Sequence, residues 1–389
     1  MTRSLFSKRP SPYYLLAPDF RRNSAGIRVM HMLCDALMRS GYEAYVTANV
    51  LSPGLMTPRL TNDVIKTHQT QGVEPIVVYP EVVSGNPLAG NVVARYLLNR
   101  PGFLSRGVTA ESFGKDDLIF AYTKDLQLPD RPADRVMFMP PFDRSIFCLP
   151  QDPAKRVPGK VCYYRGRSAQ SHIDPAILGD NPIEITPHFP NTWEGLADVF
   201  QQCEYFYCAE SSALAGEAAL CGCISVLLSS EWAPQVIGKS ETQGFGLAHG
   251  NDPAQIEEAR RTLPLLLERI VQQEQEFWPA LDNFIDITQA ATREYQEARK
   301  GGAGTLWLAP RVLTNVERGI AKAYLRDKMI PALELVVFDF LGQPDKLNRT
   351  LNSINALDGL YASIQICVMG VDVSKVAPQV NLDTVKIPA

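Results

Sequence analysis

The segment "CAESSALAGEAALCGCISVLL" (residues 208–228) gathers side chains that could take part in chemistry. It holds two glutamates, Glu210 and Glu217, with a pair of serines between them and three cysteines close by. Such a set has four interpretations: a metal site, a redox site, a phosphate site, or a packed turn of an α/β domain. The spacing of the cysteines and the elements on either side of the segment discriminate between these four.

The cysteines argue against the metal and redox interpretations. None forms a CxxC pair, and no histidine stands at zinc spacing from them. They are scattered through apolar stretches that are predicted to be strand or helix, at positions 34, 148, 162, 203, 208, 221, 223 and 367. We therefore expect reduced cysteines packed in the core and no metal site.

The elements around the glutamates predict a strand, a loop, a helix and a second strand. "YFYC" and "CISVLL" have the composition of buried strands, and "ALAGEAAL" is predicted to be a short helix that Gly222 ends. The loop "AESS" then lies at the carboxyl end of the first strand. Open parallel sheets bind their ligands at that end.

The start of this short helix is predicted to favour an anion. Ser211 or Ser212 is a natural N-cap, which would leave the N–H groups of Ala213 and Leu214 unpaired. Unpaired N–H groups and the helix dipole together favour a phosphate.

The two glutamates are candidates for binding hydroxyl groups. Glu217 lies one turn into the helix, where its carboxylate could accept hydrogen bonds from the vicinal hydroxyls of a ribose, and Glu210 could reach a second hydroxylated group. The alternative is that Glu217 only complements the helix dipole and Glu210 is a solvated loop charge. The residue types alone leave both interpretations open.

Further candidates follow other predicted strands of the second half. Arg165 and Arg167 flank Gly166 directly after the strand "VCYY", and the planar fork of an arginine matches phosphate oxygens. His188, in "TPHFPN", is expected at the same edge, where it could touch a base or a phosphate. The alternative is that the arginines are surface residues and His188 is a loop histidine without a partner.

Strands and helices alternate in both halves of the chain, which predicts an α/β fold with two doubly wound, Rossmann-like parallel sheets facing each other across a cleft. Between the halves lies the proline-rich, charged segment 140–160. In the first half, helices are predicted at 27–41 and 88–99, and a strand at 135–140. The predicted domains are 1–150, 151–300, a helical connector 301–330 and a strand-helix-strand module 331–389.

Composition excludes some classes of function. The chain has 389 residues, 46% hydrophobic and 21% charged, with a net charge of -4, so we expect a globular protein without a nucleic-acid partner. No apolar run is long enough to span a bilayer, which predicts a cytoplasmic location. Basic residues near the start are interpreted as solvated surface charge, with an anionic ligand or association with the inner face of the membrane as alternatives. These residues are Arg3, Lys8, Arg9, Arg21, Arg22 and Arg28.

Four motifs, in the right order between residues 13 and 250, resemble those of nucleotide-sugar glycosyltransferases with the GT-B fold, especially the retaining clan with paired glutamates. "EAALCGCISV" is similar to that clan's glutamate, small residues, Cys-Gly and following strand. "YRGR" resembles its strand-end Gly-Arg, and "PPFDRSIFCLP" its inter-domain linker. "SAGIRVMHMLCDALMRSGYEAYV" resembles its amino-terminal glycine loop and helix.

The resemblance implies transfer of a sugar from a nucleoside diphosphate donor to a glycan or lipid-linked acceptor in surface polysaccharide assembly, with no cofactor and no metal. It assigns the donor ribose to Glu217, the transferred sugar to Glu210, and the neighbourhood of the reacting centre to Gly26. It assigns the diphosphate to the following residues: Arg165, Arg167, and Ser212 to Leu214.

The sequence departs from the clan at several points. Six residues separate the paired glutamates instead of seven, Gly26 stands alone instead of in a pair, and Tyr122 and Asp125 stand where many members have a histidine. A sugar-nucleotide epimerase of the same fold and a catalytically silent binding module therefore remain alternatives. The segment "LELVVFDFLGQPDKLNRTLNSINAL" resembles the opening of a GT-A transferase, and we assign it no activity.

Overall fold

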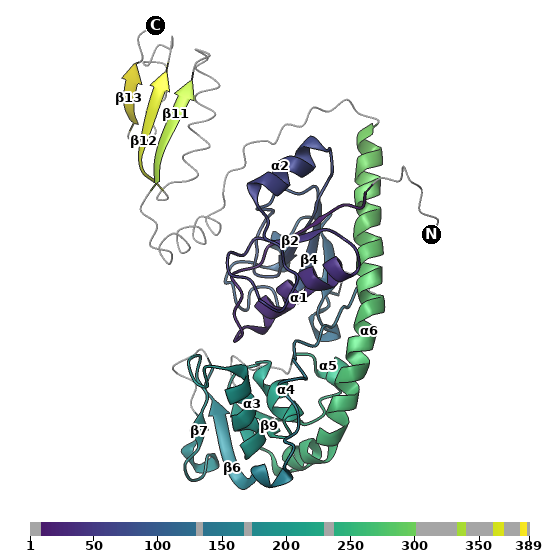
Figure 1. The fold of residues 1–389 in the computed structure, drawn as a ribbon, viewed down its shortest axis with the longest axis vertical. Helices are drawn as coiled ribbons and strands as arrows, with labels where there is room; N and C mark the ends of the chain where they lie inside the picture. The colour runs from purple at the N-terminus through teal and green to yellow at the C-terminus, as the bar shows by residue number, and fades with distance from the viewer. Residues whose placement is uncertain are drawn as a thin grey trace. The chain divides into compact units, whose positions relative to one another are not determined.

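The computed structural model forms two compact units, Met1–Gly301 and Gly302–Ala389 (Figure 1). The structure describes residues 9–129, 135–166, 173–228 and 237–300, and three strands of the second unit at 333–339, 361–368 and 382–386.

The first sheet of the larger unit has five parallel strands in the order β2-β1-β3-β4-β5. From β1 the chain moves outward to β2 and then returns to the other side of β1, so the strand order reverses between β1 and β3. The five strands are β1 (Tyr13–Leu15), β2 (Ala44–Val46), β3 (Ile76–Pro80), β4 (Val92–Leu97) and β5 (Leu118–Ala121). Nearly all of their residues are buried, as expected for strands of a parallel sheet that is covered on both faces.

Helix α1 (Ala25–Arg39) covers the first sheet and confirms the prediction for this part of the chain. Met30, Leu33 and Leu37 recur at helical spacing and are buried against the sheet. Helix α2 (Asn62–Thr70) follows β2, and the Thr61 hydroxyl accepts a hydrogen bond from the Val64 N–H at its start.

The helix predicted at 88–99 is wrong, because this stretch contains β4 instead. Its β-branched residues Val92 and Val93 favour a strand, and every residue of β4 is buried, including Arg95. The strand predicted at 135–140 is reduced to a single bridge between Val136 and Ala121.

The second sheet is also parallel, in the order β10-β9-β8-β6-β7. Read from β7, this is the same relative order as in the first sheet, with the reversal between β6 and β8. Its strands are β6 (Val157–Tyr164), β7 (Ile183–Glu184), β8 (Cys203–Cys208), β9 (Ile224–Leu227) and β10 (Leu247–His249). The predicted fold class, α/β with two doubly wound, Rossmann-like parallel sheets, is confirmed.

Helices α3 (Trp193–Gln202) and α4 (Leu214–Leu220) pack on the second sheet. Gly216 of α4 lies against the ring of Phe142. A Cβ on Gly216 would lie 2.5 Å from Cζ of Phe142. Gly222 ends α4 with φ +82°, as its role as a helix stop predicts.

The long helix α6 (Pro253–Lys300) contributes to the cores of both sheets (Figure 1). Leu266 and Ile270 pack in the second core, whereas Phe277, Leu281 and Phe284 pack in the first. The end of the predicted domain 151–300 thus returns to the first sheet. The short helices are α5 (Lys239–Thr242), η1 (Ala110–Ser112), η2 (Lys124–Leu126), η3 (Pro153–Lys155) and η4 (Pro175–Ile177).

The smaller unit has three parallel strands in the order β11-β12-β13. They are β11 (Leu333–Asp339), β12 (Tyr361–Val368) and β13 (Leu382–Lys386). The predicted helical connector 301–330 lies outside the described residues.

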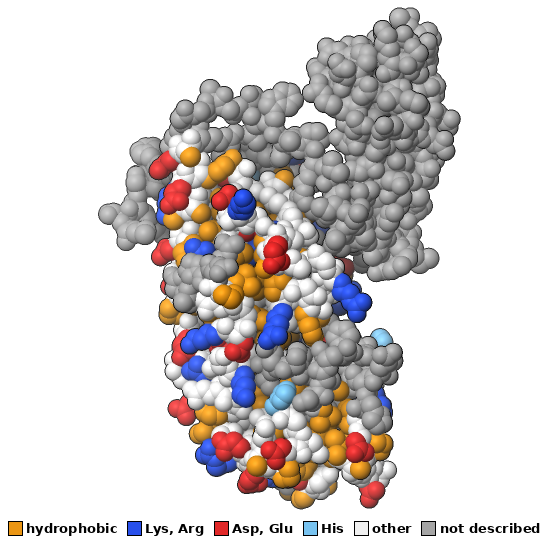
Figure 2. All heavy atoms as spheres, turned by 180° about the vertical axis from the view of Figure 1, so that it is seen from behind, with side chains coloured by type: hydrophobic (Ala, Val, Ile, Leu, Met, Phe, Trp, Pro, Cys, Tyr) orange, Lys and Arg blue, Asp and Glu red, His pale blue; other side chains and the backbone are white. Residues whose placement is uncertain are grey.

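Acidic and basic side chains are interspersed over the described part of the face that Figure 2 shows. Among the helices that the structure describes, none is both long enough and apolar enough to pass through a bilayer.

The buried side chain of Arg95 in β4 forms hydrogen bonds to two loops of the first sheet. Its side chain is 1% exposed, and its Nε donates to Asp117 Oδ2 at 2.7 Å. Its two terminal nitrogens donate to the carbonyl oxygens of Val83 and Gly85. The guanidinium therefore depends on one carboxylate to compensate its buried charge.

We expect Asp117→Ala to lower the free energy of unfolding by about 3–5 kcal/mol, because it leaves the Arg95 charge buried without its partner. The exposed neighbour provides the control, and Asp116→Ala should change stability by less than about 0.5 kcal/mol. Urea unfolding of both variants measures the difference. Equal stabilities would show that Arg95 does not depend on Asp117.

Candidate functional site

The predicted site residues lie at the points where the two strand orders reverse. Arg165 and Gly166 directly follow β6, and Glu210 follows β8, so they flank the reversal of the second sheet. Gly26 lies at the start of α1, which follows β1 at the reversal of the first sheet. Doubly wound sheets bind ligands at such points, outside the carboxyl ends of the strands.

Glu210 packs directly on Gly166. A Cβ on Gly166 would lie 2.8 Å from Oε2 of Glu210 and 2.9 Å from its Cβ, and Gly166 has φ +86°. Glu210 is only 5% exposed, so its alternative interpretation as a solvated loop charge is wrong. The carboxylate is therefore held against the backbone turn that follows β6.

Arg165 forms an ion pair with a carboxylate of the neighbouring strand. Its Nε lies 2.9 Å from Oε1 of Glu184 in β7, and its guanidinium lies over the ring of Tyr163 with 5.3 Å from Cζ to the ring centroid. The Arg165 side chain is 45% exposed, so the pair is solvated and weakly held. Arg167 lies outside the described residues.

The start of α4 differs in two respects from the prediction. The N-cap is Ala213, not Ser211 or Ser212. The Leu214 N–H, expected to be unpaired, donates to the Ser212 hydroxyl at 3.3 Å. A serine two residues before a helical N–H can fold back onto it, which the cap preference alone does not reveal. Ser211 and Ala213 are half-buried beside this turn.

Glu217, the candidate ribose ligand, forms a buried ion pair with Arg28 of α1. Arg28 Nη1 and Glu217 Oε1 are 2.7 Å apart, and the two side chains are 5% and 3% exposed. Burial raises the pKa of the Glu217 carboxyl, and the Arg28 charge and hydrogen bond oppose this effect. The interpretation of Arg28 as solvated surface charge is wrong, because the residue lies between the two sheets.

A buried carboxyl that the sequence motifs did not include, that of Glu81, lies near Gly26. A Cβ on Gly26 would touch Leu98 at 3.6 Å, and the Leu98 N–H donates to Glu81 Oε2 at 2.9 Å. Glu81 directly follows β3, is 3% exposed, and its burial raises its pKa to about 7 against the effect of backbone N–H donors. The sequence could have indicated Glu81, because it directly follows the predicted strand "PIVVYP" at the carboxyl end of the sheet.

The remaining candidates do not converge with this group. His188 is exposed in a turn, where its backbone N–H donates to the Thr186 hydroxyl at 3.3 Å. Tyr122 is buried and donates its hydroxyl to Met139 O at 2.9 Å. Asp125 accepts a hydrogen bond from the Ser240 hydroxyl at 2.6 Å, across the two halves of the larger unit.

The cysteines of the opening segment pack in the interior. Cys208, Cys221 and Cys223 are fully buried, and burial raises the pKa of the thiols of Cys208 and Cys221. Over the described ranges, we find no group of three or more histidine, cysteine or acidic side chains that could hold a metal ion.

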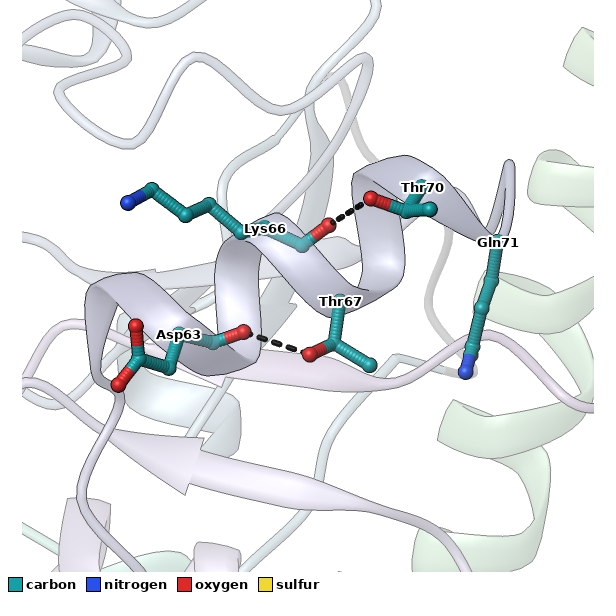
Figure 3. Close-up of a pocket in the computed structure, with 5 residues that line it drawn as sticks. All are labelled: Asp63, Lys66, Thr67, Thr70 and Gln71. Atoms are coloured by element: carbon teal, nitrogen blue, oxygen red, sulfur yellow. Dashed lines mark hydrogen bonds between the residues drawn. The ribbon is translucent and has the colours of Figure 1, made fainter.

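A cavity of about 330 Å³ lies on the surface of α2 (Figure 3). The hydroxyls of Thr67 and Thr70 point back to the carbonyl oxygens of Asp63 and Lys66 at 2.7 and 2.9 Å, so the threonine donors are satisfied by the helix itself. None of the predicted site residues lines this cavity.

No protein-family model matches the chain, and no curated protein matches it. Similar solved structures include the glycosyltransferase SnogD from Streptomyces nogalater, at 14% identity and TM-score 0.35 over 72% of this chain and 99% of that chain. The spinosyn rhamnosyltransferase SpnG complexed with thymidine diphosphate is 15% identical, with TM-score 0.32 over 73% of this chain and 100% of that chain. WaaG, a glycosyltransferase involved in lipopolysaccharide biosynthesis, is 10% identical, with TM-score 0.33 over 71% and 99%.

We expect Gly166→Ala to destabilise the protein more than Gly159→Ala does. Both glycines have positive φ, at +86° and +71°, so both variants strain the backbone. Only Gly166 also meets Glu210, whereas no atom lies within 4 Å of a Cβ on Gly159. The additional clash should cost about 1–3 kcal/mol, measured by urea unfolding. Equal losses would contradict the packing of Glu210 on Gly166.

We expect Glu81→Gln to weaken the pH dependence of stability. The pKa of Glu81 is about 7 in the folded chain against an ordinary 4.5, so the folded state binds this proton more tightly. The contribution of Glu81 to the free energy of unfolding is therefore complete below pH 4.5 and is lost as the pH rises through about 7. Chemical unfolding from pH 4.5 to 8 measures it, with the exposed Glu257→Gln as control. Parallel curves for wild type and Glu81→Gln would contradict the shift.

Proposed function

We propose that the chain is a GT-B glycosyltransferase that transfers a sugar from a nucleoside diphosphate donor to a glycan or lipid-linked acceptor. One observation supports this most: two charged candidate residues, Arg165 and Glu210, flank the point where the order of the second sheet reverses. Both residues follow predicted strands, and the order of the sheet makes these two strands the ones that flank the point where doubly wound sheets bind ligands.

The donor diphosphate is proposed to bind beside Arg165 and the turn that starts α4. The Arg165–Glu184 pair is partly exposed, so exchanging the carboxylate for a diphosphate costs little. The guanidinium fork can then donate two hydrogen bonds to phosphate oxygens. Arg167 and Ser211 to Leu214 complete the proposed diphosphate contacts, and His188 remains a candidate for the base.

The proposed catalytic effect is electrostatic. When the bond between the sugar and the diphosphate breaks, negative charge grows on the departing phosphate oxygens, and a cation placed there stabilises the transition state more than the ground state. Glu210 is proposed to orient the transferred sugar, and Gly26 to let the acceptor approach from the first sheet. Retention of the anomeric configuration and a role in surface polysaccharide synthesis are finer parts of the same proposal.

We expect calorimetry to detect binding of a nucleoside diphosphate when uridine, thymidine, guanosine and adenosine diphosphates are tested in turn. Arg165→Ala should weaken the affinity roughly tenfold, because it removes a charge-assisted hydrogen bond. Arg260→Ala is the matched control. Arg260 is 43% exposed and pairs with Glu204 at 2.9 Å, near the start of β8, so its removal should leave the affinity unchanged.

The outcomes separate the parts of this proposal. If no nucleoside diphosphate binds, the proposed function is wrong. If one binds equally well to wild type and to Arg165→Ala, the diphosphate does not lie beside Arg165. Incubation with a nucleotide sugar alone then distinguishes transfer from epimerisation, because an epimerase forms a new sugar nucleotide without an acceptor.

A further inference from the structure

We propose that Arg28, although it belongs to the first sheet, is a positioning residue for the nucleotide site of the second sheet, where it holds the Glu217 carboxylate ionised and in place. This inference rests on the proposed function, in which Glu217 accepts the hydroxyls of the donor ribose. It adds a residue that none of the four sequence motifs assigned to the donor.

The contact joins two elements that start at ligand-binding edges. Arg28 lies in the first turn of α1, which follows β1, and Glu217 lies in α4, which follows β8. Their side chains are 189 positions apart in the sequence, and the Nη1 to Oε1 distance is 2.7 Å. The donor site of the second sheet is therefore completed from the first.

The Arg28 guanidinium is held by a third element. It lies over the ring of Trp193, the first residue of α3, with 5.4 Å from Cζ to the ring centroid. Arg22 lies against the same ring at 6.0 Å and donates to Asn191 O at 3.3 Å. A cation fixed between an aromatic face and a carboxylate has little freedom to turn, so it fixes the carboxylate as well.

The pair is poorly suited to a role in stability alone. Removing two charges from water costs about as much as their attraction returns, and apolar side chains of the same size often stabilise as well or better. Arg28 Nε is in addition buried without a hydrogen-bond partner among the described residues. Such a donor costs about 1–3 kcal/mol. An arrangement of this kind fits a site in which the charge itself is needed.

The Glu217 carboxylate retains capacity to accept hydrogen bonds while it binds Arg28. A carboxylate has two oxygens with about four lone-pair positions, and the ion pair uses one oxygen, Oε1. An ionised carboxylate can accept from both hydroxyls of a ribose, whereas a protonated one is itself a donor. Binding of the nucleotide should therefore require Glu217 to be ionised.

Arg28 is the group that opposes protonation of Glu217. Burial raises the pKa of Glu217, and the charge and hydrogen bond of Arg28 lower it again. The other titratable groups nearby are Cys221, which directly follows α4, and Tyr122, which interacts electrostatically with both Arg28 and Glu241. Burial raises the pKa values of Cys221 and Tyr122 away from neutral pH, so without Arg28 the carboxyl of Glu217 is expected to take up a proton as the pH falls.

The test is the pH dependence of nucleoside diphosphate affinity, measured by calorimetry between pH 6 and 9 with the diphosphate that the wild-type protein binds. The variants are Arg28→Met, Arg28→Lys and the double variant Arg28→Met/Glu217→Gln. Arg39→Met is the control, because Arg39 lies on the same helix, is 55% exposed and also pairs with a carboxylate, that of Asp35. Each affinity is divided by the wild-type affinity at the same pH. This ratio removes the pH dependence that comes from ionisation of the nucleotide, which affects every variant equally.

We expect Arg28→Met to bind at least roughly tenfold more weakly than wild type at pH 6 and to recover as the pH rises to 9, because Glu217 ionises again. Arg28→Lys restores a charge without the fork and should remove most of the pH dependence. The double variant cannot ionise at position 217, so it should bind weakly at every pH. Arg39→Met should match wild type throughout.

The failures are distinguishable. If wild type binds no nucleoside diphosphate, the proposed function fails and this inference fails with it. If wild type binds and the ratio for Arg28→Met does not change with pH, Arg28 acts only as structural support, and the inference alone is wrong. Thermal unfolding verifies that each variant folds. If Arg28→Met does not fold, Arg28→Gln, which is polar but uncharged, replaces it, and the same pH-dependent loss is expected.

Discussion

The buried ion pair between Arg28 and Glu217 is the interaction on which the site depends most. A carboxylate with 3% of its side chain exposed stays charged only when a cation lies beside it, and here the cation comes from the other half of the larger unit. The charge state of the candidate donor site is thus coupled to the packing of α1 against α4. A change in that packing that moves Arg28 away from Glu217 makes the carboxyl easier to protonate.

Topology places the candidate residues of the weak motifs at equivalent points of the two sheets. Two sheets with the same doubly wound order each have one reversal, and the loops beside these reversals are where Arg165, Gly166, Glu210 and Gly26 lie. Alternating strands and helices predicted both sheets, since buried parallel strands have a continuous apolar composition that is easily recognised. The strand, loop, helix and strand of residues 203–227 could be predicted for the same reason.

The features that the sequence could not predict are strands and buried charges whose interaction partners lie far away along the chain. The helix proposed for residues 88–99 failed because the spacing of apolar residues in a fully buried strand resembles that of a helix, and only the pairing with Asp117 makes Arg95 acceptable in the interior. Arg28 was interpreted as surface charge because nothing near it in the sequence offers a carboxylate that it reaches. Glu81 was missed because the backbone N–H that binds its buried carboxylate, that of Leu98, lies 17 positions away along the chain.

Helix α6 gives the chain an order of assembly. The core of the first sheet contains Phe277, Leu281 and Phe284, and the Thr288 hydroxyl lies 2.8 Å from that of Tyr13 in β1. During synthesis from the amino terminus, the first sheet therefore remains without part of its core until the entire second sheet has emerged from the ribosome. The native packing of the first half is therefore completed only after the second half has been made, although its strands are made long before.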